Sequence, residues 1–255
     1  MRNRAIATVA FALTASALLP SVGLASGGAG GSGGAGLGGT TNAPSSPGST
    51  GNVQPGNITV SATSDGITLA TRASALLRHQ LTLTGTAPRS YAGKTIEIQR
   101  LGHETGWAWA STVSATVTRN GTFSAVWQTN HIGEFSIRAV LDGTVRAAGA
   151  EPQVTITVYR PSLATMYGPG FWGRRTACGE KLERTTLGVA NRTLPCGTKV
   201  GIYYGGHTLI VRVIDRGPYA NGADWDLTEA TEKALKIPGT ATIGAVSLPV
   251  PPRNP

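Results

Sequence analysis

An acidic residue near the end of the chain stands where a protein can use it for site chemistry. Asp215 directly follows the predicted strand His207–Ile214, and the pair Gly217-Pro218 forces the chain to turn just after it. A carboxylate on a turn at the end of a rigid strand is held in place while it stays accessible. The pattern favours a functional role for Asp215, although an Asp that binds backbone amides to stabilise the turn fits the same position.

Two other acids lie in short motifs on either side of Asp215. Glu180 closes a glycine-containing loop motif, where a solvated loop acid is the alternative to a functional one. Asp226 precedes a predicted helix, and Glu229 follows it at the spacing of a capping box. Either Asp226 or Thr228 can cap that helix, so the sequence leaves Asp226 open as a cap or as a functional acid.

The middle of the chain, residues 58–160, predicts an immunoglobulin-like β-sandwich. Short segments with alternating apolar residues recur about every ten residues and are separated by turn signals. Asn120-Gly121 between two such segments is typical of a two-residue hairpin. Trp107 and Trp109 have the spacing that shares one face of a strand, where packing is favoured over stacking on a sugar. We expect a spacer or wall-binding module without catalysis.

The first 57 residues predict export and a tether. Arg2 and Arg4 precede the apolar run Ala5–Leu19, and small residues follow, which is typical of a signal peptide over residues 1–25. The run is shorter than the roughly 20 residues that span a bilayer, so no integral membrane segment is expected after cleavage. Residues 26–57 contain no charged residue and are rich in glycine and serine, which indicates a flexible linker.

The chain has only two cysteines, Cys178 and Cys196, among its 255 residues. A single pair in an exported chain predicts a disulfide, because such a protein folds in an oxidising compartment. The bond would fix the loop two residues before Glu180. The four histidines are dispersed without metal-ligand spacing, so neither a metal nor a cofactor is predicted.

Five short motifs between Leu163 and Leu248 occur in the order found in the rare lipoprotein A (RlpA-like) family. They are Tyr167-Gly-x-Gly, Thr176-Ala-x-Gly-Glu180, Thr193-Leu-Pro-x-Gly-Thr198, Val211-Arg-Val-x-Asp-Arg-Gly-Pro218 and Asp226-Leu-Thr. This region closely resembles that family, whose double-psi β-barrel fold is shared with barwin-like proteins, expansins and some lytic transglycosylases. The resemblance implies a six-stranded barrel with a short helix over residues 161–250, a shallow glycan-binding cleft, and a Pro-rich tail at 251–255. It says nothing about residues 26–160.

The resemblance also implies a reaction. Lytic transglycosylases cut the β-1,4 bond between N-acetylmuramic acid and N-acetylglucosamine without water, because the muramic O6 hydroxyl attacks its own anomeric carbon and leaves a 1,6-anhydro end. One carboxyl group can serve first as acid and then as base, whereas a simple glycosidase uses two. By resemblance, Asp215 is the acid/base, and Glu180 stabilises the transition state or keeps Asp215 protonated.

The same resemblance implies glycan contacts by Tyr167, Arg216 and Asp226. Asn191 stands where the family often has a histidine, and it can exchange hydrogen bonds with sugar hydroxyls but cannot titrate. Two functions therefore stay open. One is a secreted peptidoglycan lytic transglycosylase; the alternative is a non-catalytic, expansin-like module that binds and loosens wall glycan.

The charge of the chain fits an exported wall protein. Residues 160–255 carry 12 basic and 7 acidic side chains within a chain of net charge +9. Such a domain is attracted to anionic wall polymers. Export argues against nucleic acid as a partner, so the predicted partners are peptidoglycan glycan strands and anionic wall polymers. The predicted location is extracellular or associated with the cell wall.

Overall fold

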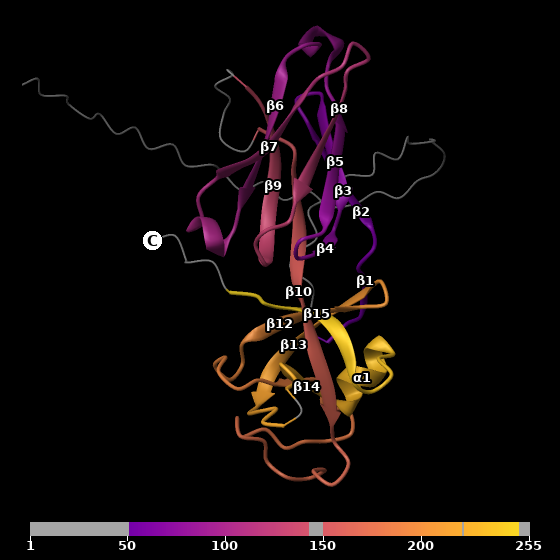
Figure 1. The fold of residues 1–255 in the computed structure, drawn as a ribbon, viewed down its shortest axis with the longest axis vertical. Coiled ribbons are helices and arrows are strands. Elements are labelled where there is room, and N and C mark those ends of the chain that lie inside the picture. The colour runs from indigo at the N-terminus through magenta and orange to yellow at the C-terminus, as the bar shows by residue number, and fades with distance from the viewer. Residues whose placement is uncertain (1–50, 143–149, 221, 250–255) are drawn as a thin grey trace, which may run out of the picture. The chain divides into compact units, whose positions relative to one another are not determined.

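The computed structural model describes residues 51–142, 150–220 and 222–249. The predicted signal peptide, residues 26–50 of the predicted linker and the Pro-rich tail lie outside these residues. The described part is mostly β-strand, and its two β regions are joined by one long strand, β10 (Gln153–Tyr167) (Figure 1). It contains no helix that is long and apolar enough to cross a membrane.

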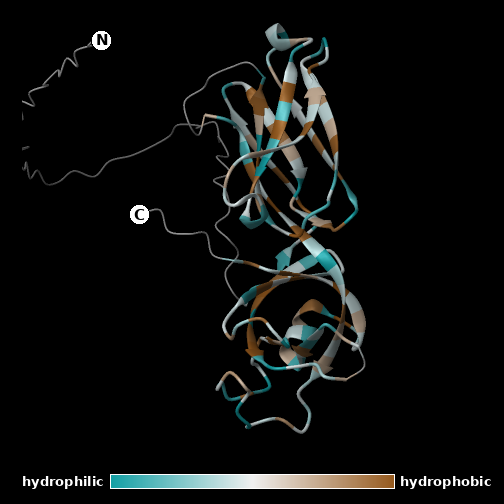
Figure 2. Cartoon of the chain, turned by 60° about the vertical axis from the view of Figure 1, so that its left-hand side comes forward, coloured by the Kyte–Doolittle hydropathy of each residue, from teal (hydrophilic) through white to brown (hydrophobic). Residues whose placement is uncertain are grey.

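Two packed sheets form the predicted sandwich. One sheet has the order β2 (Thr59–Ser64), β3 (Ile67–Arg72), β5 (Gln80–Thr86) and β8 (Thr122–Gln128). In the other, β7 (Ala110–Thr116), β6 (Thr95–Leu101), β9 (Gly133–Leu141), β10 and β4 (Ser74–Leu76) lie side by side. Buried and exposed residues alternate strictly along β8, and teal and brown residues alternate along these strands in Figure 2. Period-two alternation thus builds the core, as predicted.

The core of the sandwich is apolar. Its largest fully buried side chains include Leu69, Leu83, Ile98 and Phe135. Trp127 is also buried and meets Phe135 edge to face, with ring centroids 5.9 Å apart. Trp127 therefore packs in the core of the sandwich.

Two local predictions for the sandwich were wrong. Asn120-Gly121 does form a turn, closed by the Thr118 and Thr122 backbones, but β7 pairs with β6 and β8 pairs with β5. The turn carries the chain from one sheet to the other because each flanking strand buries its apolar face on a different side of the core. Trp107 has a φ of 62° in the loop after η2 (His103–Thr105), so it does not share a strand face with Trp109.

The second β region is a closed barrel of six strands. Its order is β14 (Trp225–Thr228), β11 (Val189–Ala190), β13 (His207–Asp215), β12 (Lys199–Tyr204), β15 (Ala241–Ser247) and the second half of β10, and β10 pairs in parallel with β14 to close the ring. Figure 1 shows helix α1 (Glu229–Leu235) beside these strands. Gly205 and Gly206, with φ of 56° and 82°, supply the tight turn between β12 and β13.

The expected domain borders are not sharp in the structure. The boundary predicted at residue 160 falls inside β10, which pairs with β9 before it and with β15 from Arg160 onward. The end of the predicted linker also contacts the barrel, since β1 (Gln54–Pro55) pairs with β13 and Tyr203 donates a hydrogen bond to Asn57. Backbone pairing attaches residues 51–57 to the barrel although their composition is typical of a tether.

Candidate active site

Two of the predicted acids are brought together by the short strand β11. Ala190 of β11 is the Cα partner of Asp215 in β13 and of Asp226 in β14. The two acids therefore flank one strand, and two strand spacings separate their Cα atoms by about 10 Å. Thr165 of β10 continues the row as the partner of Asp226. Barrel closure thus assembles a pair of carboxylates from separate motifs.

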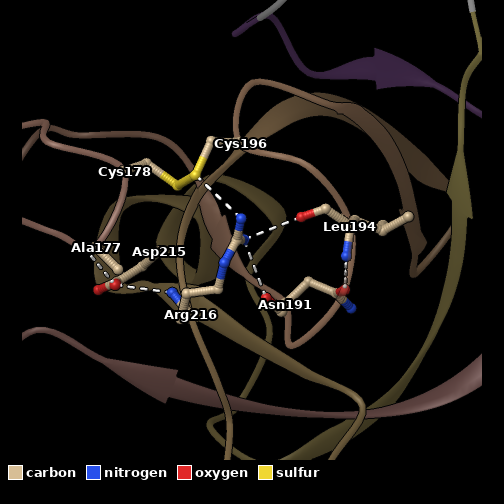
Figure 3. Close-up of a disulfide and its surroundings, with 7 residues drawn as sticks. All are labelled: Ala177, Cys178, Asn191, Leu194, Cys196, Asp215 and Arg216. Atoms are coloured by element: carbon tan, nitrogen blue, oxygen red, sulfur yellow. Dashed lines mark hydrogen bonds between the residues drawn. A yellow bond between two sulfur atoms is a disulfide. The ribbon is translucent and has the colours of Figure 1, made fainter.

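Asp215 is half-buried at the end of β13, and backbone amides hold one of its oxygens. Its Oδ1 accepts hydrogen bonds from the N–H groups of Ala177 and Arg216, each 2.8 Å long (Figure 3). The turn role considered for this residue is therefore present. Oδ2 has no hydrogen-bond partner in the described part of the chain, so one oxygen is positioned and the other is available to a ligand.

Asp226 is half-buried on strand β14. Burial raises the pKa of its carboxyl, the hydrogen bond from Thr165 Oγ1 at 2.9 Å opposes this, and the charge of Asp215 raises the pKa further. The helix cap is Thr228, whose hydroxyl accepts from the Thr231 N–H. Asp226 is therefore a strand residue that faces another acid, and the alternative of a helix cap is excluded.

Tyr167, the last residue of β10, contributes a buried hydroxyl without a partner. Its oxygen has no hydrogen bond in the described structure. Burial is the main cause that raises the pKa of the phenol, followed by the charges of Asp215, Asp226 and Glu180. Since an unpaired buried donor costs about 1–3 kcal/mol, the hydroxyl is suited to bind an oxygen of a ligand beside the carboxylates.

Glu180 closes a tight loop at the edge of this cluster. Its carbonyl accepts from the Thr176 N–H at 2.7 Å, while its side chain is exposed. Its charge acts on Tyr167, which places it near the acid pair. Among the residues that the structure describes, no basic side chain forms an ion pair with Asp215, Asp226 or Glu180. The site thus collects negative charge in a basic domain.

The side chains of Asn191 and Arg216, both predicted to contact glycan, form hydrogen bonds within a loop. Asn191 Oδ1 accepts from the N–H groups of Thr193 and Leu194, at 3.1 and 2.9 Å. The guanidinium of Arg216 donates to the carbonyl of Leu194 at 2.9 Å and to Cys196 Sγ at 3.2 Å. In this structure both side chains brace residues 191–196, and their contact with glycan stays a prediction.

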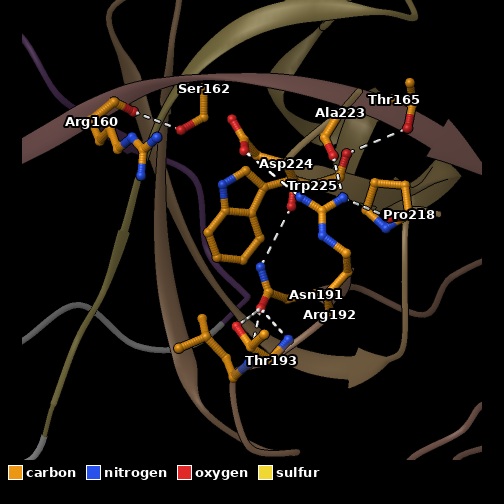
Figure 4. A network of polar contacts seen from close by, with 11 residues as sticks. Arg160, Ser162, Thr165, Asn191, Arg192, Thr193, Pro218, Ala223, Asp224 and Trp225 are labelled. Carbon is orange, nitrogen blue, oxygen red and sulfur yellow. Dashed lines mark hydrogen bonds and ion pairs between the residues drawn. The ribbon is translucent and has the colours of Figure 1, made fainter. Parts of the chain in front are cut away.

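Two functional neighbours were missed by the sequence reasoning. Thr165 bonds Asp226, and its spacing of two from Tyr167 on one strand was a usable signal for a shared face. Arg192 donates to the carbonyls of Pro218 at 2.7 Å and Ala223 at 2.8 Å, so it ties down the segment between the two acids (Figure 4). Nothing in the local pattern around Arg192 indicated that role.

The predicted disulfide is confirmed. Cys178 and Cys196 are bonded, and the bond joins the loop that precedes Glu180 to the loop braced by Asn191 (Figure 3). Both loops border Asp215. Ala177 in the first loop donates its N–H to the Asp215 carboxylate, and Asn191 in the second donates its N–H to the Asp215 backbone carbonyl at 3.2 Å.

Comparison with known proteins identifies the barrel. Residues 162–248 match a family model described as lytic transglycolase. A Synechocystis protein named "Probable endolytic peptidoglycan transglycosylase RlpA" is 40% identical over 98 residues, which cover 38% of this chain and 30% of that protein. A Campylobacter jejuni protein named "Endolytic peptidoglycan transglycosylase RlpA" is 35% identical over 82 residues, which cover 31% of this chain and 30% of that protein.

Residues 162–248 thus form a double-psi β-barrel domain of the RlpA-like family, as the motifs predicted. The chain spans less than a third of the length of these two curated relatives. Among solved structures, the Streptomyces papain inhibitor is 24% identical and aligns over 35% of this chain and 93% of its own, with a TM-score of 0.29. That score is too low to support an argument.

Proposed function

We propose that the barrel is a peptidoglycan lytic transglycosylase that acts at the cell wall. The observation that carries the proposal is the pair Asp215 and Asp226, held on either side of Ala190 without a cationic partner among the described residues. A carboxyl group whose pKa is raised by burial beside a second carboxylate is a common arrangement for proton transfer. The match of this barrel to proteins named as peptidoglycan transglycosylases supports the choice of substrate.

In this reaction Asp226 and Asp215 have different roles. Asp226, whose pKa is raised by burial, is suited to donate its proton to the glycosidic oxygen as the bond to the muramic anomeric carbon breaks. The carboxylate of Asp215, oriented by two amides, stabilises the positive charge that develops on the sugar. The muramic O6 then bonds to the anomeric carbon, and its proton passes to Asp226, which restores the starting state.

This assignment differs from the sequence-based one, in which Asp215 is the acid/base. That assignment stays a prediction, and the burial of Asp226 favours the exchanged roles. Glu180 is exposed and lies at the edge of the cluster, so we assign it to long-range charge stabilisation. Tyr167 offers its unpaired hydroxyl to a sugar oxygen.

The chemical structure of the reaction product tests this proposal. The protein is incubated with purified peptidoglycan, and mass spectrometry looks for 1,6-anhydro ends. We expect these ends with the wild type and a strong loss with both Asp226→Asn and Asp215→Asn. Asp224→Asn is the matched control, because this neighbouring acid pairs with Arg192 in a half-exposed position. Reducing-end products without anhydro ends would contradict the mechanism.

A second function is supported by one observation. Asn191 cannot titrate, and its side chain is engaged with its own loop, so this chain lacks the family histidine at that place. An expansin-like module that binds and loosens wall glycan needs no such group. Pelleting with peptidoglycan at equal strength in the wild type and Asp226→Asn, with no anhydro product in either, would favour this function.

A further inference from the structure

The disulfide lies beside the positioned oxygen of Asp215. Both of its cysteines contact the end of β13: the Cys178 N–H donates to the carbonyl of Ile214 at 3.3 Å, and Cys196 Sγ accepts from Arg216 Nη2 at 3.2 Å. Ile214 and Arg216 are the residues immediately before and after Asp215. The covalent bond therefore joins two loops that contact the residues on either side of the acid (Figure 3).

One of these loops has few other attachments. Residues 176–180 close on themselves through the Thr176–Glu180 and Gly179–Thr176 backbone hydrogen bonds. Within the described structure, the loop tip is bonded to the rest of the barrel by the disulfide, the Cys178–Ile214 hydrogen bond and the bond from Ala177 to Asp215. Ala177 is exposed, so packing contributes little to holding its N–H in place. The disulfide is the strong link of the three.

The other loop is fixed independently. The Gly197 N–H donates to the carbonyl of Val213 at 2.8 Å, and Arg216 donates to Leu194. Cys196 is therefore a firm anchor, and the disulfide transmits its position to Cys178 and so to the neighbouring Ala177 N–H. The geometry identifies one rigid path from the barrel wall to a hydrogen bond on the carboxylate.

We infer that the Cys178–Cys196 disulfide is a positioning device for Asp215, which holds the Ala177 amide on Oδ1 so that the carboxylate keeps its catalytic orientation. The inference rests on the proposed function. It also makes the activity sensitive to thiols: a dithiol reductant attacks the bond, leaves two cysteine thiols, and is itself oxidised to its cyclic disulfide. The barrel stays folded while the loop tip loses its covalent anchor.

The first measurement does not depend on activity. Amide hydrogen exchange is followed by NMR in the oxidised protein, in the reduced protein, and in a Cys178→Ala/Cys196→Ala double variant. We expect the Ala177 N–H to exchange at least tenfold faster without the disulfide, while the amides of β12 and β15 keep their rates. Unchanged exchange at Ala177 would overturn the inference. If the double variant does not fold, the reduced wild type provides the same comparison.

The second measurement is kinetic. Loss of the anchor should lower kcat for release of anhydro ends by about 10–100-fold, because small misplacement of a catalytic group has effects of that size. KM should change little, since the glycan contacts remain. Ile243→Val, a core substitution away from the site, controls for general loss of stability and should keep the wild-type kcat.

The outcomes separate the two hypotheses. Faster Ala177 exchange with an unchanged kcat overturns the positioning role and leaves the proposed function standing. Absence of anhydro products even from the oxidised wild type refutes the proposed function, and the inference about catalysis falls with it. A lowered kcat that returns to the original value after re-oxidation supports both.

Discussion

The acids of the candidate site in the barrel differ from the paired acids of the sandwich. In the sandwich, Glu104 meets Arg100 and lies 3.8 Å from His131, and Glu151 lies 3.5 Å from Arg138. In the barrel, Asp215 and Asp226 face each other across one strand and have no basic partner among the described residues. Like charges that approach without compensation cost stability, so their retention points to chemistry in the barrel and to structure in the sandwich.

Buried hydroxyls show the same difference. In the sandwich, Thr71 donates to the carbonyl of Thr82, and Thr129 donates to Leu76. Within the described residues, the buried side-chain oxygens without a partner are those of Tyr167 and Thr176, both in the barrel motifs. A protein satisfies buried polar groups where it can, which suggests that these hydroxyls are kept for a ligand.

Replacement of the proposed proton donor tests the role of the acid pair most directly. Asp226→Asn should lower the rate of anhydro-end formation by about 10²–10⁴-fold, because it removes the proposed proton donor. Asn retains an Oδ1 that can accept from Thr165, so the local fold should be preserved. Asp224→Asn, in the same segment, should stay within twofold of the wild type when product release is measured by mass spectrometry.

An Asp226→Asn variant with full activity would contradict the assignment of the proton donor. The same assay on Asp215→Asn would then decide between the two acids: its inactivity alone would restore the sequence-based role of Asp215. Activity in both variants would remove the acid pair from the mechanism altogether.

The sequence predicted the barrel well because its motifs are local. Gly-Pro after Asp215, the short helix after Asp226 and the cysteine pair are each visible within a few residues. Long-range pairing was not visible. Strand β11 has only two residues, too few to show any period, yet Ala190 is what brings the two acids together.

The hydrogen bonds of side chains in loops could also not be predicted from the neighbouring sequence. Asn191 was expected to contact glycan because of its place in the motif order, but its acceptor is used by the turn that follows. Whether an Asn bonds its own backbone depends on turn geometry, which tertiary packing decides. In the sandwich, the alternation of apolar residues predicted the strands. It did not predict which strands pair, because packing between the sheets decides the pairing.

The second prediction concerns stability. Phe135→Ala should lower the free energy of unfolding by about 3–5 kcal/mol, because it removes a fully buried ring and leaves a cavity in the sandwich core. The kcat of the folded fraction should be unchanged, since no acid of the site lies in that core. Urea unfolding followed by circular dichroism measures the first effect, and product assays well below the midpoint measure the second. A fall in kcat of tenfold or more would assign the sandwich a part in catalysis.

The smallest expected effect is a difference in stability that depends on pH. Burial raises the pKa of Asp226 above its ordinary value of 3.8, so the folded state binds a proton more tightly than the unfolded chain does. The wild type therefore loses stability as pH rises from about 3.8 through the raised pKa, and Asp226→Asn does not. At pH 7 the variant should be the more stable of the two, and the difference should vanish below pH 3.8.

Urea unfolding of both proteins at a series of pH values measures this difference, with Asp224→Asn as the control that should follow the wild type. A variant less stable than the wild type at pH 7 would mean that the charge of Asp226 is compensated in the folded state. The barrel would then treat its acids as the sandwich does, and the contrast between the two regions would be lost. A gain in stability together with a loss of activity would instead show that the site keeps this acid at a cost to the fold.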